Sequence, residues 1–118
     1  MPLLSVRTNA TPPDSTAVEA LLREFSIKVS QHLGKPEAYV MTCFEAGVPM
    51  TFAGSSSEPV AYLELRSVGS IGTDATTAMS ADFCQLIEER LGVPAARTYI
   101  AFSPWEGYLW GWNGRTFG

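Results

Sequence analysis

The chain has 118 residues, 46% hydrophobic and 17% charged, a composition that predicts a single globular domain spanning residues 1–118. Its formal net charge of −4 argues against nucleic acid or an anionic membrane as a partner, because both are bound by clustered basic side chains. No apolar run approaches the roughly 20 residues of a membrane span, and the N-terminus lacks the layout of a signal peptide, so we expect a cytoplasmic protein.

The first half of the chain is typical of a strand, a helix and a second strand. Residues 3–6 form an apolar-rich run that predicts a strand starting almost at the first residue. Apolar residues then recur every three or four positions over 18–33, which is the stripe of an amphipathic helix, and Gly34 ends it. The β-forming residues 39–44 predict the second strand, and residues 50–52 predict a short additional one.

The second half repeats this order. Residues 60–65 (VAYLEL) predict a third strand, and the glycine-punctuated segment 67–72 connects it to a second helix. Apolar residues between 79 and 91 share one face of that helix, and Gly92 ends it. Residues 98–102 (TYIAF) predict the fourth strand. We expect the three tryptophans of the tail to pack between subunits: Trp105, Trp110 and Trp112.

A repeat at the ends of the two helices defines the architecture. The first helix ends with Leu-Gly-Lys-Pro at 33–36 and the second with Leu-Gly-Val-Pro at 91–94, and a strand follows each. A strand–helix–strand crossover is right-handed in nearly all proteins, so each half gives two parallel strands with a helix on one face. The two halves predict an α+β fold, a pseudo-symmetric β-α-β-β-α-β unit whose two helices lie on one face of a four-stranded sheet.

The other face of this sheet has no cover within the chain. The strands at 60–65 and 98–102 show too little alternation of apolar and polar residues for a face in contact with water. Closed symmetric assembly is the usual way to bury such a face. We therefore expect a homo-oligomer.

Pro2 is the first candidate for chemistry. Removal of the initiator methionine would make its secondary amine the N-terminus, and the amine is a base only when its pKa falls from the ordinary value of about 8. Burial and a nearby cation both lower the pKa of an amine, and Lys35 could supply the cation, because both strands of a β-α-β unit start at the same end of the sheet. Judged by its position in the sequence alone, Pro2 is more simply interpreted as an inert residue at the edge of a strand than as a catalytic base.

Several segments, in order from the first residue to the last, resemble the macrophage migration inhibitory factor family. The main ones are MPLL at 1–4, LGKP at 33–36, GSSSEP at 54–59, SVGSIG at 67–72, ERL at 89–91, YI at 99–100 and GWN at 111–113. The family fold is the β-α-β-β-α-β unit, assembled as a homotrimer whose sheets form the inside of a barrel. The resemblance thus implies the cover that the bare face requires.

The resemblance also implies an activity, the cofactor-free and metal-free keto–enol tautomerisation of phenylpyruvate-like and dopachrome-like compounds, an isomerase reaction. In this reading the freed Pro2 amine is the general base, and the substrate is a small aromatic α-keto acid. Lys35 and the backbone N–H of Val68 match the groups that bind the substrate's carboxylate. Three aromatic positions match the pocket: Tyr39, Phe117 and, from the neighbouring subunit, Tyr99.

Departures from the family pattern concern specificity and redox chemistry. Ala101 stands where a family member has asparagine, and Trp110 where one has a smaller aliphatic residue, so the substrate preference should differ. The Cys-x-x-Cys pair of some members is absent, which argues against thiol–disulfide activity. We expect Cys43 and Cys84 to pack as small core side chains.

Plainer interpretations stand beside these. Lys35 could simply interact with the C-terminal dipole of the first helix, Tyr99 could be ordinary core packing, and His32 is expected on the surface at a helix end. The main alternative function is a cytokine-like interaction protein that binds a receptor and whose pocket is vestigial or only binds ligands.

Overall fold

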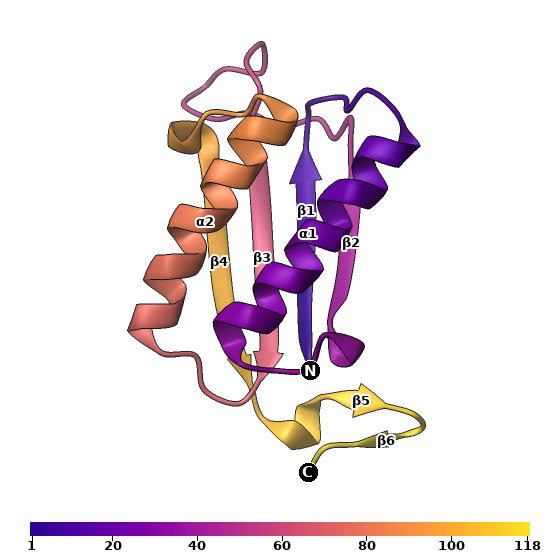
Figure 1. Cartoon of the computed structure of the whole chain (residues 1–118). Coiled ribbons are helices and arrows are strands. Elements are labelled where there is room, and N and C mark those ends of the chain that lie inside the picture. The colour runs from indigo at the N-terminus through magenta and orange to yellow at the C-terminus, as the bar shows by residue number, and fades with distance from the viewer.

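Two long helices lie on one face of a four-stranded sheet in the computed structural model, which describes all residues from 1 to 118 (Figure 1). The strands are ordered β2-β1-β3-β4, with β1 parallel to β2, β3 parallel to β4, and β1 antiparallel to β3. The predicted α+β unit is confirmed. Its elements are β1 (Pro2–Thr8), α1 (Ser15–Leu33), β2 (Met41–Glu45), β3 (Ala61–Val68), α2 (Thr73–Leu91), β4 (Thr98–Trp105), and a terminal hairpin of β5 (Gly111–Trp112) and β6 (Arg115–Thr116).

Several strand boundaries differ from the prediction. Tyr39 lies in a short 3-10 turn, Glu37–Tyr39, and not in a strand, while residues 50–52 form no strand. β3 and β4 run on to Val68 and Trp105, which pair with each other at the end of the parallel ladder. The reason is that hydrogen bonds between neighbouring strands carry the extended backbone past the point where the apolar pattern fades.

Both helices end at the glycines that the sequence predicts. The Asp14 carboxylate accepts a hydrogen bond of 2.8 Å from the backbone N–H of Ala17, which caps α1. Gly34 and Gly92 close the two helices in the left-handed conformation, with φ values of 64° and 70°. Neither helix is long and apolar enough to cross a membrane.

The core lies between the helices and the inner face of the sheet. Phe25 of α1 and Phe83 of α2 meet edge to face at 5.3 Å between ring centroids, and both are fully buried. The two cysteines are not part of this core, contrary to expectation. Cys43 is exposed because it occupies an outward position of β2, and Cys84 is only half-buried on α2.

The uncovered face of the sheet is more polar than predicted. Exposure alternates strictly along β3, and charged side chains occupy outward positions on three strands. Arg7 of β1 pairs with Glu45 of β2 at 3.2 Å, and Arg66 pairs with Glu64 along β3. The expected lack of alternation was therefore wrong for β3, whereas exposure does not alternate along β4. Any subunit covering this face would meet charges that already have partners.

A cluster of charged side chains connects the two helices. Asp82 of α2 accepts hydrogen bonds from the Lys28 ammonium at 2.7 Å and pairs with the His32 ring at 2.8 Å. His32 also lies edge-on against the ring of Phe83. His32 is thus half-buried between the helices, with its side chain 22% exposed, and the prediction of a surface position was wrong.

We expect the Asp82→Asn variant to lose about 1–2 kcal/mol of stability at neutral pH, and this loss should shrink as the pH falls below 3.8. Burial by itself would raise the pKa of Asp82, but hydrogen bonds from Lys28 and His32 and their positive charges outweigh it, so the pKa is lowered from its ordinary value of 3.8. A carboxyl group whose pKa is lowered by folding stabilises the folded state at pH values above its pKa in the unfolded chain. This contribution disappears as the pH falls through its pKa in the folded state.

Urea unfolding of both proteins between pH 2 and pH 7 measures this difference. The exposed Glu88→Gln variant on the same helix is the control, since Glu88 has no ion-pair partner. A difference between wild type and Asp82→Asn that stays constant across the whole range would contradict the pairing.

Candidate active site

Pro2 is buried at the very start of β1. It lies directly across from Ser67, near the end of β3, in the antiparallel register of the two strands. On the other side of β1, the start of β2 is adjacent, since Leu3 pairs with Met41. The N-terminus, the end of β3 and the start of β2 therefore meet at one edge of the sheet, beside the terminal hairpin (Figure 1).

Lys35 reaches this edge from the end of α1. Its ammonium donates hydrogen bonds to the Ser67 hydroxyl at 2.8 Å and to the Val68 carbonyl oxygen at 2.5 Å. The backbone of Lys35 is fixed too, because the Ser30 hydroxyl donates to its carbonyl oxygen at 2.6 Å. The predicted approach of Lys35 to the start of β1 is confirmed. An interaction with the helix dipole alone does not account for its hydrogen bonds to Ser67 and Val68.

The N-terminal amine has an altered acidity in this setting. In the structure this amine belongs to Met1, and its pKa is lowered from the ordinary value of 8.0 by burial first, then by the charge of Lys35 and a hydrogen bond with it. Lowering the pKa of an amine increases the fraction that is neutral, and only the neutral form can accept a proton.

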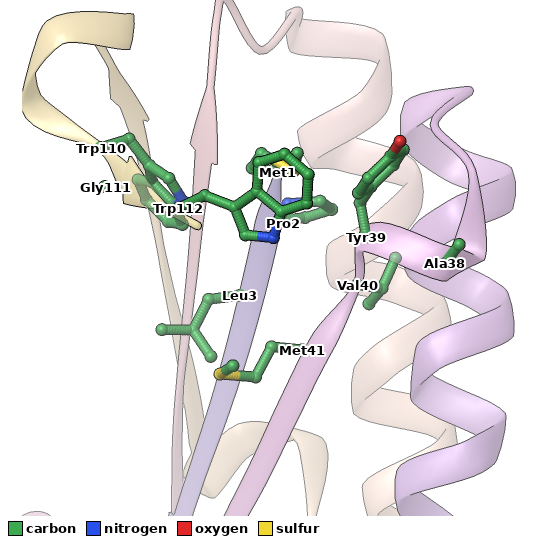
Figure 2. A pocket seen from close by; sticks show the side chains of 10 residues that line it. All are labelled: Met1, Pro2, Leu3, Ala38, Tyr39, Val40, Met41, Trp110, Gly111 and Trp112. Atoms are coloured by element: carbon green, nitrogen blue, oxygen red, sulfur yellow. The ribbon is translucent and has the colours of Figure 1, made fainter. Parts of the chain in front are cut away.

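A pocket of about 390 Å³ opens beside the amine. Figure 2 shows Trp110 and Tyr39 on opposite sides of Pro2, with Leu3 and Met41 beyond. Among the lining side chains, only the Tyr39 hydroxyl and the two indole N–H groups are polar. The lining residues are Met1, Pro2, Leu3, Ala38, Tyr39, Val40, Met41, Trp110, Gly111 and Trp112.

Aromatic rings connect the terminal hairpin to this pocket. Trp112 meets the ring of Tyr39 edge to face at 5.9 Å and stacks on Phe117 at 5.8 Å with an interplanar angle of 11°. Trp110 lines the pocket, in agreement with its predicted effect on substrate preference, whereas the expectation that the tail tryptophans pack between subunits did not anticipate that Trp112 lines it too. The Asn113–Gly114 dipeptide, with both residues at positive φ, turns the chain between β5 and β6 and is the sequence signal that could have predicted this hairpin.

A second hollow, of about 610 Å³, lies next to the first. Val68 and Phe117 line this hollow together with Trp105, which packs edge to face against Trp110 at 6.1 Å. The stack of Phe117 on Trp112 joins the two hollows. Val68 and Phe117 are therefore neighbours of the Pro2 pocket and do not line it in this chain.

Tyr99 lies at the opposite end of the sheet from Pro2. It is the second residue of β4, which runs parallel to β3, whereas Pro2 pairs with the end of β3. Tyr99 is 66% exposed and touches the ring of Phe52 at 5.2 Å between centroids. The interpretation of Tyr99 as ordinary core packing is therefore wrong, and the chain does not bring it to its own pocket.

Comparisons with known proteins agree with this architecture. The family model described as "Macrophage migration inhibitory factor (MIF)" matches residues 1–118. The chain belongs to this family. The macrophage migration inhibitory factor of Meriones unguiculatus is 37% identical over 117 residues, covering 99% of each chain, and the homolog of Brugia malayi is 34% identical over 118 residues, covering all of both.

Solved structures of the macrophage migration inhibitory factor family have the same fold. The homologue from Prochlorococcus marinus superposes with a TM-score of 0.90 at 44% identity, over 98% of this chain and 99% of that one. The protein from Trichinella spiralis superposes with a TM-score of 0.85 at 32% identity, over the same shares of the two chains. Family and fold are thus shown along the full length.

Proposed function

We propose that this protein is a cofactor-free keto–enol tautomerase of small aromatic α-keto acids such as phenylpyruvate, with Pro2 as its base once Met1 is removed. One observation carries the proposal: the N-terminal amine, which in the structure belongs to Met1 next to Pro2, has a lowered pKa and sits at the edge of an apolar, aromatic pocket beside a lysine ammonium. Membership of the macrophage migration inhibitory factor family supports the same class of protein.

The reaction needs only a proton to move. The neutral Pro2 amine takes a proton from the carbon next to the keto group, and the electron pair of that C–H bond forms the carbon–carbon double bond of the enol. The carbonyl oxygen gains the charge and then takes up the proton. The reverse reaction returns the proton to the carbon, so the reaction consumes no oxidant or reductant.

The surrounding groups fit an aromatic keto acid. The Lys35 ammonium pairs with the substrate's carboxylate and, in doing so, orients the reacting carbon toward Pro2. In this proposal the Val68 N–H contacts the same carboxylate, and the rings of Tyr39 and Trp112 hold the aromatic group, with Phe117 stacked against Trp112. The few polar groups of the lining favour an unsubstituted ring over one that carries a hydroxyl.

The proposal includes a homotrimer in which Tyr99 enters the pocket of a neighbouring subunit. Its support is the position of Tyr99, exposed and far from the chain's own pocket, together with two edge strands, β2 and β4, that each have one unpaired side. Arg97 anchors the turn next to Tyr99. Its guanidinium lies over the ring of Phe52 and donates to four backbone carbonyl oxygens, those of Phe52, Ser55, Glu58 and Pro59.

Phenylpyruvate tautomerisation by protein whose intact mass shows Met1 removed tests the proposal, and we expect turnover. The matched control is the same chain with Met1 retained by an N-terminal extension. Its Pro2 nitrogen is a tertiary amide that cannot accept a proton, so it should be inactive. A Met1-free protein without turnover, or equal turnover by both proteins, would contradict Pro2 as the base.

A further inference from the structure

Ser67 interrupts the apolar stripe that β3 turns toward the helices. The preceding inward residues of this strand, Ala61, Leu63 and Leu65, are buried and apolar, and Ser67 takes the next inward position with only 1% of its surface exposed. A buried hydroxyl costs stability unless it has a hydrogen-bond partner. The partner of Ser67 is the Lys35 ammonium, at 2.8 Å.

The Lys35 side chain is held at its tip by two neutral oxygens. One is the Ser67 hydroxyl and the other is the Val68 carbonyl oxygen. No carboxylate pairs with this ammonium, so its charge remains available to a ligand. Because a lysine side chain has many rotamers of similar energy, losing one anchor would let the ammonium spread toward solvent.

The sheet register places this anchor beside the N-terminal amine. Ser67 and Pro2 are direct partners in the antiparallel β1–β3 ladder, and directly opposite residues have Cβ atoms about 5 Å apart. The N-terminal amine of Met1, the residue directly before Pro2, lies within hydrogen-bonding reach of Lys35. The hydroxyl thus holds the cation at the point where an amine and an incoming acid would meet.

We propose that Ser67 is a positioning residue, whose hydroxyl holds the Lys35 ammonium between the Pro2 amine and the carboxylate of the substrate. This inference rests on the proposed function for its kinetic consequences, while its effect on the amine does not require turnover. Ser67 touches neither the reacting atoms nor the ligand and acts only through Lys35.

The Ser67→Ala variant, in its Met1-free form, tests this role. We expect kcat/KM for phenylpyruvate at neutral pH to fall about 3- to 10-fold, mainly through a higher KM, since an ammonium with one anchor binds the acid less well. We also expect the acidic limb of the pH profile to move to higher pH, because a displaced cation lowers the pKa of the amine less. The Ser67→Thr variant, which retains the hydroxyl, should restore both.

A matched control is Ser5→Ala, a serine on β1 whose side chain points to the other face of the sheet. It should leave the KM and the pH profile unchanged. In parallel, NMR titration of the N-terminal amine in protein labelled at proline reports the position of the cation without any substrate. We expect the amine of Ser67→Ala to titrate at higher pH than that of wild type.

The outcomes separate the two proposals. A wild type without turnover but with an amine whose titration shifts in Ser67→Ala would overturn the proposed function and support the role of Ser67. An active wild type whose amine titration, KM and pH profile are all unchanged by Ser67→Ala would overturn the role of Ser67 alone.

Discussion

The Pro2→Gly variant is expected to lose at least about a hundredfold in kcat/KM for phenylpyruvate while it keeps the wild-type fold and assembly. A positioned general base contributes about 10²- to 10⁴-fold to a proton transfer. Glycine still offers an amine, but proline holds its nitrogen in a ring that is buried at the start of β1. Without the ring the amine moves freely, and a misplacement of about 1 Å can cost on the order of a hundredfold.

The measurement is kcat/KM on proteins whose intact masses show that Met1 has been removed, with circular dichroism and native mass to check fold and assembly. Pro13→Gly, the same substitution in the exposed loop before α1, should behave as wild type. Full activity of Pro2→Gly would contradict the need for the proline ring, and turnover by the protein that retains Met1 would locate the base elsewhere. The Tyr39 hydroxyl would then be the nearest candidate, because it is the only hydroxyl group in the pocket lining.

Local signals in the sequence were enough to predict the fold. The two Leu-Gly-x-Pro segments end the helices, and right-handed crossovers then give two parallel pairs of strands, whereas the order β2-β1-β3-β4 is seen only in the structure. The strand boundaries were less predictable because they depend on pairing: Val68 is extended because Trp105 pairs with it, and the apolar pattern carries no trace of that partner. The polar outer face was missed because Arg7, Glu45 and Arg66 lie just beyond the ends of the predicted strands, so the expectation did not include them.

The candidate site divides in the same way. The approach of Lys35 to the N-terminus follows from the topology of a β-α-β unit and could be predicted. The contact of Ser67 with Lys35 could not be predicted, because the position of Ser67 beside Pro2 depends on the register between β1 and β3. The contribution of Trp112 depends on a terminal hairpin whose turn was visible in the sequence but whose contact with Tyr39 was not. Tyr99 lies far from the pocket of its own chain, so a role for it at the site requires a second copy of the chain.

The Lys35→Ala variant is expected to show two separable defects in the Met1-free protein. Loss of the ammonium removes a charge-assisted partner of the carboxylate, so kcat/KM for phenylpyruvate at neutral pH should fall about 10- to 100-fold, chiefly through KM. It also removes a cation that lowers the pKa of the Met1 amine in the structure and that we expect to act in the same way on the Pro2 amine. The acidic limb of the profile should therefore move to higher pH, though not fully to that of a free amine, because burial is the larger cause of the shift and remains.

Two comparisons separate these defects. Lys35→Arg keeps the positive charge, so its acidic limb should stay close to that of wild type even if the bulkier guanidinium weakens binding. An aryl ketone that enolises but has no carboxylate cannot use the ammonium for binding. With this substrate, Lys35→Ala should therefore be less active than wild type only because a larger fraction of its N-terminal amine is protonated. This difference should vanish above the pH at which the N-terminal amines of both proteins are neutral. If the acidic limb does not move in Lys35→Ala, burial alone keeps the amine neutral, and the contact between Lys35 and Ser67 serves only to bind the acid.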